Sequence, residues 1–324
     1  MGFVAALETQ PRRLTGGRWK FRPRYTTLGS SGAFRSIPDD RTVGFFQAGV
    51  PFNSMPPPGV RHMHNKVFPV AATLMLACTL AHAEGPMPQP SRLDAISAAK
   101  TLTVCTTGDY KPYTYLNPGT KAFEGIDIDL AKDLGKSLGA EVKFVQTSWP
   151  KLMADYASGA CDIAVGGISV TLERSRQAYF SLPTARSGKT PITRCEDVDK
   201  FQTLEQIDKP GVKAIVNPGG TNEKFARANL KQATIEVYQD NVTIFDQIAD
   251  GKADLMMTDA EETLLQQKLR PGLCAVHPDK PFTFSEKAFL LPRGDEIFKH
   301  YVDQWVHLVS ENGTLDAVFK RWLP

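Results

Sequence analysis

Strand-like and helix-like segments alternate along most of this chain, and this alternation restricts the possible folds more than any other feature. Short runs rich in Val, Ile and Leu predict strands, whereas apolar residues spaced three and four positions apart predict helices. The predicted strands are 101–105, 142–145, 162–165, 214–216, 235–237 and 253–257, and the predicted helices are 128–138, 149–157, 222–230, 242–248 and most of 295–319. This order predicts an α/β protein with mostly parallel sheets and helices on both of their faces.

The alternation occurs twice, on either side of an extended stretch at 182–191, and a second extended stretch follows at 289–292. Two α/β units joined by two crossings predict a two-lobed molecule with a hinge. Lobe 1 is expected to comprise 92–187 plus 289–324, and lobe 2 to comprise 188–288. The cleft between two such lobes is the default place for a ligand.

Residues 1–83 have the features of a leader. The segment 63–83 begins with Met-His-Asn-Lys, continues with an apolar run and ends with Ala-His-Ala. This order is typical of a secretory signal peptide, here cleaved after Ala83, and the apolar run is shorter than the ~20 residues that span a bilayer. Lipidation at Cys78 is a weaker alternative, because Met-Leu-Ala is a poor lead-in to a lipidated cysteine. We expect export and no membrane insertion.

A signal peptide does not act from the middle of a chain, so we expect the native protein to start at Met63. Residues 1–62, which are rich in Arg, Pro and Gly, would then be translated upstream sequence. The alternative is a disordered extension.

The charge of the chain is unevenly distributed. Residues 1–83 contain ten of the 38 Lys and Arg residues but only three of the 35 acidic residues, so the remainder carries a net charge of about −4. A weakly acidic body gives no support to nucleic-acid binding or to a basic membrane-docking face.

Four cysteines remain after the leader: Cys105, Cys161, Cys195 and Cys274. In an exported protein they suggest two disulfides, for which sequence alone permits three connectivities. The lobe assignment favours Cys105–Cys161 in lobe 1 and Cys195–Cys274 in lobe 2.

Several cofactor motifs are missing from the sequence. It contains no P-loop, GxGxxG, HExxH, GxSxG or CxxC motif, and its histidines show no metal-ligand spacing. We therefore expect no metal and no organic cofactor.

Ser169, Thr171 and Arg174 follow a predicted strand and a Gly pair. Two hydroxyls, loop amides and a guanidinium suit a carboxylate, which Arg can hold in a bidentate manner. The alternative is a helix start capped by Thr171, with Arg174 on a solvated face.

The segment 217–224, Asn-Pro-Gly-Gly-Thr-Asn-Glu-Lys, is a strand-to-helix junction with a glycine turn. Exposed amides and the helix dipole favour an anion there, with Thr221 and Asn222 as candidate contacts. Thr221 could instead cap the helix. Glu223 could be a first-turn acid, a position that lowers the pKa of a carboxylate.

Three further candidates lie at strand-to-helix junctions. Tyr110 and Trp149 could stack on a ligand ring or could be ordinary packing residues. Asp259 could pair with a ligand ammonium or could cap the next helix.

The string Gly-Ile-Ser169-Val-Thr-Leu-Glu-Arg174, followed by Tyr179-Phe-Ser-Leu-Pro183, resembles the signature of periplasmic polar amino-acid-binding proteins. The resemblance extends from about residue 92 to the C-terminus and implies a two-lobed, type II periplasmic binding protein fold. It also implies ligand contacts: Arg174 to the α-carboxylate, a hydroxyl from Ser169, ring contacts from Trp149 and Tyr110, a turn at Gly220-Thr221, and Asp259 toward the ammonium.

Longer strings resemble the exported cyclohexadienyl dehydratases, which are built on the same fold. They include Thr106–Pro112, Thr147–Pro150, Gly188–Ile192 and the run Phe201–Lys231. The resemblance implies conversion of prephenate to phenylpyruvate or of arogenate to phenylalanine in the interlobe cleft of a periplasmic enzyme. It also implies that the general acid of the Gly-Gly-Thr-Asn-Glu motif corresponds to Glu223.

The resemblance implies small-molecule substrates and no cofactor, and it leaves the preference between prephenate and arogenate open. The alternatives are a transport-associated receptor that binds an amino acid without turnover, and a signalling module of the same fold. The sequence sets no oligomeric state.

Overall fold

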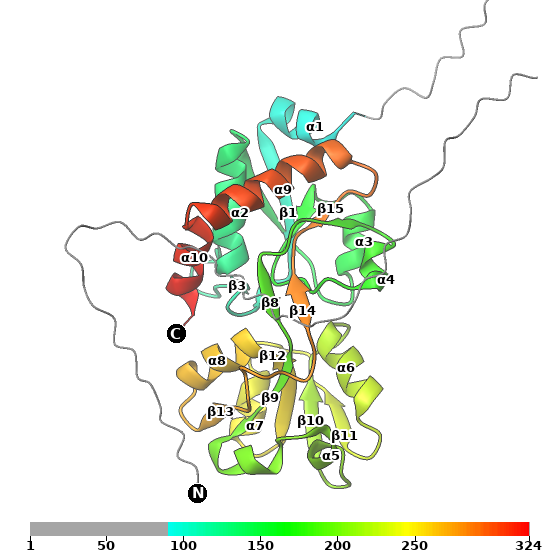
Figure 1. The fold of residues 1–324 in the computed structure, drawn as a ribbon, viewed down its shortest axis with the longest axis vertical. Coiled ribbons are helices and arrows are strands. Elements are labelled where there is room, and N and C mark those ends of the chain that lie inside the picture. Colours follow the sequence, from blue (N-terminus) through cyan, green and yellow to red (C-terminus); the bar gives the residue numbers. More distant parts are fainter. Residues whose placement is uncertain (1–89, 324) are drawn as a thin grey trace, which may run out of the picture. The chain divides into compact units, whose positions relative to one another are not determined.

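A computed structural model describes residues 90–323 (Figure 1). The leader predicted for residues 1–83 lies outside this range. Within the described range the chain forms two five-stranded sheets and two small sheets, with helices packed around the larger ones. None of the described helices is long and apolar enough to cross a membrane.

The first large sheet has the strand order β5-β1-β6-β15-β7. Its strands are β1 (Thr101–Thr106), β5 (Glu141–Gln146), β6 (Ile163–Ala164), β7 (Tyr179–Phe180) and β15 (Leu290–Leu291). Strand β1 pairs parallel with β5 and β6, whereas β15 pairs antiparallel with β6 and β7. We call the part built around this sheet lobe 1.

Helices surround the first sheet (Figure 1). They are α1 (Arg92–Ala99), α2 (Ile126–Ser137), α3 (Leu152–Ala157), α4 (Leu172–Ser175), α9 (Glu296–Glu311) and α10 (Thr314–Trp322). Helix α2 shows why they pack there. Its apolar residues Ile126, Leu130 and Leu134 recur every four positions and are fully buried, whereas Lys132 and Lys136 are exposed.

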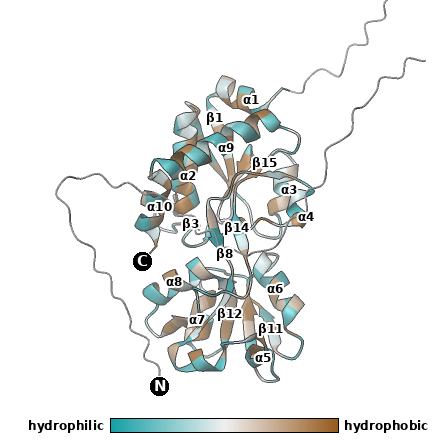
Figure 2. Cartoon of the chain, viewed as in Figure 1, coloured by the Kyte–Doolittle hydropathy of each residue, from teal (hydrophilic) through white to brown (hydrophobic). Residues whose placement is uncertain are grey.

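The second large sheet, the centre of lobe 2, has the order β11-β10-β12-β9-β13. Its strands are β9 (Lys189–Arg194), β10 (Lys213–Val216), β11 (Thr234–Val237), β12 (Leu255–Asp259) and β13 (Leu273–Ala275). Strand β10 pairs parallel with β11 and β12, whereas β9 pairs antiparallel with β12 and β13. In Figure 2 the central strands are mostly brown, as expected for strands covered on both faces.

The helical segments of lobe 2 are η1 (Cys195–Lys200, a 3₁₀ helix), α5 (Leu204–Ile207), α6 (Thr221–Asn229), α7 (Ile244–Ala249) and α8 (Ala260–Leu269). Helix α6 follows β10 and helix α8 follows β12 directly. Both helices therefore begin at the same edge of the sheet, where parallel strands end and ligand sites usually form. The parallel strands predicted from the sequence form the centre of each sheet. The antiparallel strands β9 and β15 follow the two crossings between the lobes.

The two crossings between the lobes are β8 (Ala185–Ser187) and β14 (Ser285–Lys287), which pair antiparallel. The first crossing lies within the predicted stretch 182–191. The second lies just before the predicted stretch 289–292, which instead forms β15 inside the first sheet. The buried residues Phe289, Leu290 and Leu291 explain this difference, because an apolar run is stabilised more in a sheet core than in a hinge. The lobe boundaries at 187/188 and 288/289 remain a prediction.

A three-stranded antiparallel sheet, β2 (Asp109–Tyr110), β3 (Thr114–Leu116) and β4 (Phe123–Glu124), follows β1 in lobe 1. It carries Tyr110 to the edge of the lobe. Two disulfides complete the fold, Cys105–Cys161 in lobe 1 and Cys195–Cys274 in lobe 2. Both pairings confirm the prediction from the sequence.

Candidate active site

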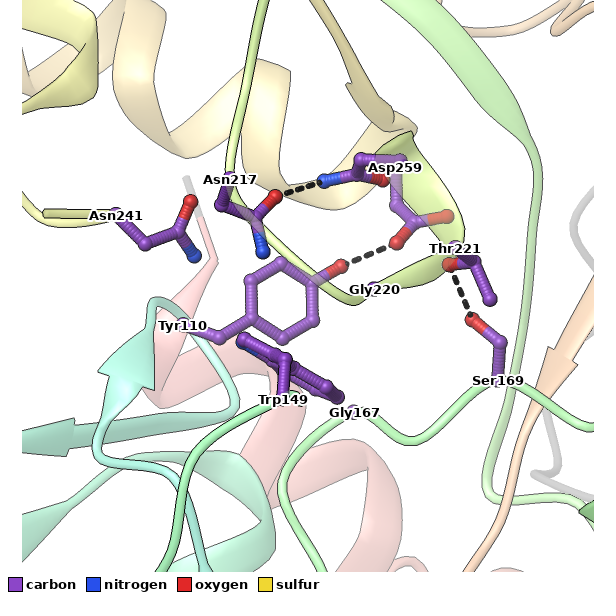
Figure 3. Close-up of a pocket in the computed structure, with 10 residues that line it drawn as sticks. Tyr110, Trp149, Gly167, Ser169, Asn217, Gly220, Thr221, Asn241 and Asp259 are labelled. Atoms are coloured by element: carbon purple, nitrogen blue, oxygen red, sulfur yellow. Dashed lines mark hydrogen bonds between the residues drawn. The ribbon is translucent and has the colours of Figure 1, made fainter. Parts of the chain in front are cut away.

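A pocket of about 270 Å³ lies where residues of both lobes meet (Figure 3). Six of the nine site residues predicted from the sequence line it: Tyr110, Trp149, Ser169, Thr221, Asn222 and Asp259. The other lining residues are Gly167, Asn217, Gly220 and Asn241. Arg174, Thr171 and Glu223 do not line it.

Tyr110 and Trp149 form an aromatic wall of the pocket. Their ring centroids are 5.7 Å apart in an edge-on arrangement, and Tyr110 also stacks on Tyr113 at 5.5 Å. The Trp149 Nε1–H donates to Asp109 Oδ1 at 3.0 Å, which fixes the plane of the indole. Each ring packs against a neighbouring ring and also lines the pocket, so both the packing role and the ligand-stacking role predicted from the sequence fit this geometry.

Gly167 allows the loop at 166–167 to lie directly against the rings of Tyr110 and Tyr113. Its φ is +69°, and a Cβ at this position would lie 2.5 Å from the Tyr110 ring and 2.7 Å from the Tyr113 ring. Only glycine accommodates both conditions without displacing the rings. The loop is held by the buried carboxylate of Asp127, which accepts from the amides of Gly166 and Gly167 at 2.8 and 2.7 Å.

Asp259 lies at the end of β12 and receives three donors. Lys189 Nζ is 2.9 Å from Oδ1, and Lys287 Nζ and the Tyr110 hydroxyl each lie 2.6 Å from Oδ2. Burial alone would raise the pKa of Asp259, but the charges of Lys189 and Lys287 outweigh it and hold the pKa well below its usual range. The carboxylate is therefore ionised, and both of its oxygens already accept hydrogen bonds from side chains of this protein.

The environment of Asp259 differs from both sequence interpretations. Its side chain makes no capping hydrogen bond to α8. Its charge is compensated by two buried lysines of the same molecule, so it is not a free acceptor for a ligand ammonium. The sequence analysis missed Lys189 and Lys287. The available signal was a lysine at the edge of an otherwise apolar extended segment, where a buried charge requires a partner.

The Ser169 hydroxyl connects the two lobes and the hinge. It accepts from Lys287 Nζ at 2.9 Å and lies 3.5 Å from Thr221 Oγ1 (Figure 3). Arg174 lies behind it, with Nη1 donating to the Ser169 carbonyl at 2.9 Å. Arg174 is buried, and this burial lowers its pKa. Arg174 therefore supports the loop that carries Ser169. It neither lines the pocket nor lies on a solvated face.

Thr171 has the structural role that was the alternative in the sequence analysis. Its hydroxyl accepts from the Arg174 amide at 3.2 Å and caps α4. It thereby fixes the direction in which the Ser169 loop enters the helix.

Glu223 does not have the environment expected of a proton donor. Its Oε2 accepts from the Gly219 amide at 2.7 Å, and its Oε1 pairs with Arg227 at 2.8 Å. The bond from Gly219 and the charge of Arg227 lower the pKa of Glu223. An ionised, paired first-turn carboxylate agrees with the alternative interpretation from the sequence, in which Glu223 stabilises the start of α6.

Asn222 belongs to a chain of buried hydrogen bonds. Its Oδ1 accepts from Lys189 Nζ at 2.5 Å, and its Nδ2 donates to Thr258 Oγ1 at 3.0 Å and to Asn217 Oδ1 at 3.1 Å. The Thr258 hydroxyl in turn donates to Glu262 Oε2 at 2.5 Å. Two polar side chains thus connect the pocket to a carboxyl group on α8.

Glu262 is fully buried, and burial raises its pKa to about 8 despite the hydrogen bond from Thr258. Its Oε1 has no hydrogen-bond partner among residues 90–323. Glu262 lines a second cavity of about 240 Å³, which also involves both lobes and shares Asn241 with the first. A pKa raised in this way favours the protonated form at neutral pH, which a proton donor requires.

The sequence analysis missed Glu262. A usable signal was its spacing, because Glu262 precedes Leu265 and Gln266 by three and four positions and so shares the buried face of α8. A carboxyl group on a buried helix face is unusual and often marks a functional site.

Metal ligands are not grouped in the described part of the chain, where no cluster of three or more His, Cys, Asp and Glu side chains could hold an ion. The groups that line the two cavities include carboxyl, amide, hydroxyl, ammonium, guanidinium and aromatic groups. They can bind an anion, exclude water and exchange a proton.

Comparison with known proteins places this arrangement in a class. The model of the bacterial extracellular solute-binding proteins, family 3, matches residues 102–324, so the chain belongs to this family. An ancestral amino acid-binding protein, described as a precursor of cyclohexadienyl dehydratase, has a similar crystal structure with a TM-score of 0.67. It is 33% identical over 72% of this chain and 100% of that chain. The expected type II periplasmic binding protein fold is thereby confirmed.

Among individual relatives, a cyclohexadienyl dehydratase of Pseudomonas aeruginosa is 61% identical over 235 residues, which are 72% of this chain and 87% of the relative. The L-cystine-binding protein of Escherichia coli strain K12 is 25% identical over 230 residues, or 71% of this chain and 85% of that protein. The resemblance to the cyclohexadienyl dehydratases inferred from the sequence is confirmed.

Proposed function

We propose that this protein is a carbon–oxygen lyase that converts prephenate to phenylpyruvate and arogenate to phenylalanine in the pocket between its lobes. Two observations support the proposal together: the 61% identity to a cyclohexadienyl dehydratase, and the buried carboxyl group of Glu262, whose raised pKa of about 8 keeps it protonated at neutral pH. The second observation carries the mechanism.

The reaction requires one proton and no redox change. Prephenate loses its ring carboxylate as carbon dioxide, and the electron pair of the broken C–C bond moves into the ring. The C4 hydroxyl leaves as water once it has received a proton. A prephenate dianion plus one proton therefore gives the phenylpyruvate monoanion, carbon dioxide and water. Aromatisation drives the reaction, so the protein needs to hold the anion, exclude water and supply the proton.

Glu262 is the proton donor in this proposal, with Oε1 as the donating atom. The two cavities share Asn241, and we infer that a substrate extending from the first toward the second would have its hydroxyl near α8. Thr258 holds Oε2 and leaves Oε1 free to donate. A positioned acid contributes typically 10²–10⁴-fold in rate. Glu223, the residue expected from the sequence, is the alternative donor, but its environment favours the ionised form.

The charges around the pocket suit a dianion. Lys189, Lys287 and Arg174 are buried there, and Asp259 is the single ionised carboxylate that lines the pocket. A ligand with two carboxylates compensates the remaining positive charge, because buried charges require partners. Ser169, Thr221 and Asn222 supply hydroxyl and amide contacts, and Tyr110 and Trp149 cover the ring.

We further propose that the protein is periplasmic and is exported through cleavage after Ala83. The name of its family, bacterial extracellular solute-binding proteins, supports this location. The lobes would then extend over 92–187 plus 289–324 and over 188–288, as expected from the sequence. N-terminal sequencing of the secreted protein tests the cleavage site: Glu84 is the expected first residue.

Incubation of prephenate with purified protein starting at Glu84 tests the proposed activity. Phenylpyruvate is expected to accumulate, as followed by its ultraviolet absorbance, at a rate that a chelator does not change. A receptor of the kind represented by the L-cystine-binding relative would bind a ligand without turnover. Tight binding of prephenate with no product would therefore contradict the lyase proposal.

A further inference from the structure

Asn241 has a buried side chain in which one polar atom has no partner. The residue is 3% exposed, and its Nδ2 donates to the backbone carbonyl of Asp109 in lobe 1 at 3.0 Å. A carbonyl oxygen can only accept, so this contact shows which end of the amide is the nitrogen. The other end, Oδ1, has no hydrogen-bond partner among residues 90–323. Asn241 therefore holds a fixed acceptor that the protein itself does not use.

The position of Asn241 directs attention to the ligand. It lies between β11 and α7, and it lines both the first and the second cavity. Figure 3 shows Asn241 at one end of the pocket and Ser169 and Thr221 at the other, with the rings of Tyr110 and Trp149 between them. The pocket thus has two polar ends that are separated by aromatic rings.

The two ends differ in their chemistry. At the first end are the hydroxyls of Ser169 and Thr221, and Ser169 accepts from the buried ammonium of Lys287 at 2.9 Å. Hydroxyl donors next to a cation suit a carboxylate. The Asn241 end offers Oδ1, which can only accept, and a buried acceptor without a partner is costly until a ligand donates to it. A complementary ligand has an anionic group at one end of a ring and a hydrogen-bond donor at the opposite end.

From this geometry we propose that Asn241 Oδ1 accepts the hydrogen bond of the ring hydroxyl of the substrate and so selects ligands with a hydroxyl opposite their side chain. The inference rests on the proposed function, but it does not depend on which residue supplies the proton. In prephenate and arogenate the C4 hydroxyl lies across the ring from C1, which carries the side chain. With the side-chain carboxylate at Ser169 and Thr221, C4 points toward Asn241. The contact holds the leaving hydroxyl in one orientation.

A pair of ligands isolates this contact. 4-Hydroxyphenylpyruvate and phenylpyruvate differ only in the hydroxyl opposite the side chain. In isothermal titration calorimetry the parent protein is expected to bind the hydroxylated ligand about 3- to 10-fold more tightly, the usual size of one neutral hydrogen bond. In Asn241→Leu, which has a similar volume and no acceptor, this ratio is expected to fall to about one or below. Loss of the bond to Asp109 affects both ligands and cancels in the ratio.

Asn229→Leu is the matched control. Asn229 Nδ2 also donates to a backbone carbonyl, that of Phe225 at 2.8 Å, and Asn229 lines neither cavity. The control is expected to leave the binding ratio of the two ligands unchanged. A parent protein that binds both ligands equally, or an unchanged ratio in Asn241→Leu, would overturn the proposal.

Turnover tests whether the group at Oδ1 is the hydroxyl. Prephenate and arogenate both carry it, so kcat/KM is expected to fall about 3- to 10-fold for both substrates in Asn241→Leu. A loss confined to arogenate would place its ammonium at Oδ1 and overturn the assignment. A parent protein that prefers the hydroxylated ligand but does not convert prephenate would count against the proposed reaction alone.

Discussion

Glu262→Gln separates the chemical role of this residue from its effect on stability. Glutamine has nearly the same shape and can still accept the hydrogen bond from Thr258, but it cannot donate an acidic proton. We expect kcat for prephenate to fall about 10²- to 10⁴-fold, the usual contribution of a positioned acid, which corresponds to roughly 3–5 kcal/mol in the barrier. Glu223→Gln is the matched comparison on α6 and should retain kcat within about threefold.

The same substitution is expected to stabilise the protein at alkaline pH. The pKa of Glu262 is about 8 in the folded protein, compared with an ordinary value of 4.5. Between these values the folded state binds the additional proton, so the free energy of unfolding decreases as the pH rises from 4.5 through 8. The loss approaches about 5 kcal/mol above pH 8 as an upper estimate. Glutamine does not titrate and should avoid this loss.

Measurements of kcat at pH 7 and urea unfolding at pH 5, 7 and 9 check both effects. The stability difference between Glu262→Gln and the parent protein should grow in favour of the variant with increasing pH. A variant with nearly normal kcat would refute the role of Glu262. A hundredfold loss in Glu223→Gln instead would return that role to the residue expected from the sequence.

Three further predictions address the scaffold of the site. Asp259→Asn leaves two buried lysines without a counter-charge and should lower the free energy of unfolding by about 3–5 kcal/mol, measured in urea. The exposed control Asp250→Asn should lower it by less than about 1 kcal/mol. Equal losses in the two variants would contradict the role of the buried ion pairs. Gly167→Ala should raise KM because the added Cβ displaces Tyr110. The control Gly159→Ala has a similar φ, and its Cβ would have no neighbour within 4 Å. It should lower the free energy of unfolding only by its backbone strain of about 1–3 kcal/mol and leave KM unchanged. Replacing Cys195 and Cys274 by alanine opens a loop with a sequence separation of 79 and should destabilise the protein by about 2–5 kcal/mol in thermal unfolding, whereas an unchanged midpoint would show that the crosslink adds no stability.

The sequence predicted those features that depend on neighbours along the chain. Periodicity located the central strands and the principal helices, because a residue's face in a strand or helix follows from its position alone. The lobe assignment that followed was sufficient to pair Cys105 with Cys161 and Cys195 with Cys274. The glycine turn before α6 and the loop at Ser169 were found from their position after strands.

The features that sequence reasoning missed depend on contacts across the fold. Asp259 meets Lys189 and Lys287, which are 70 and 28 positions away, only because β9, β12 and β14 converge near the hinge. Glu262 shares a cavity with Asp109 and Lys111 of lobe 1, and its burial raises its pKa. By contrast, Glu223 follows its local signal, because the amide of Gly219 and the charge of Arg227 lie within its own turn. Local pattern thus described Glu223 as a helix-start acid, and the catalytic role that the resemblance implies for it stays a prediction.

The protonation state of Glu262 at neutral pH is the point on which the mechanism depends. A difference infrared spectrum between the parent protein and Glu262→Gln at pH 7 measures it directly, without turnover. We predict the band of a neutral carboxylic acid, which converts to carboxylate bands with a midpoint near pH 8. A spectrum with only carboxylate bands at pH 7 would contradict the account, because Glu262 would then have no proton to give to the leaving hydroxyl.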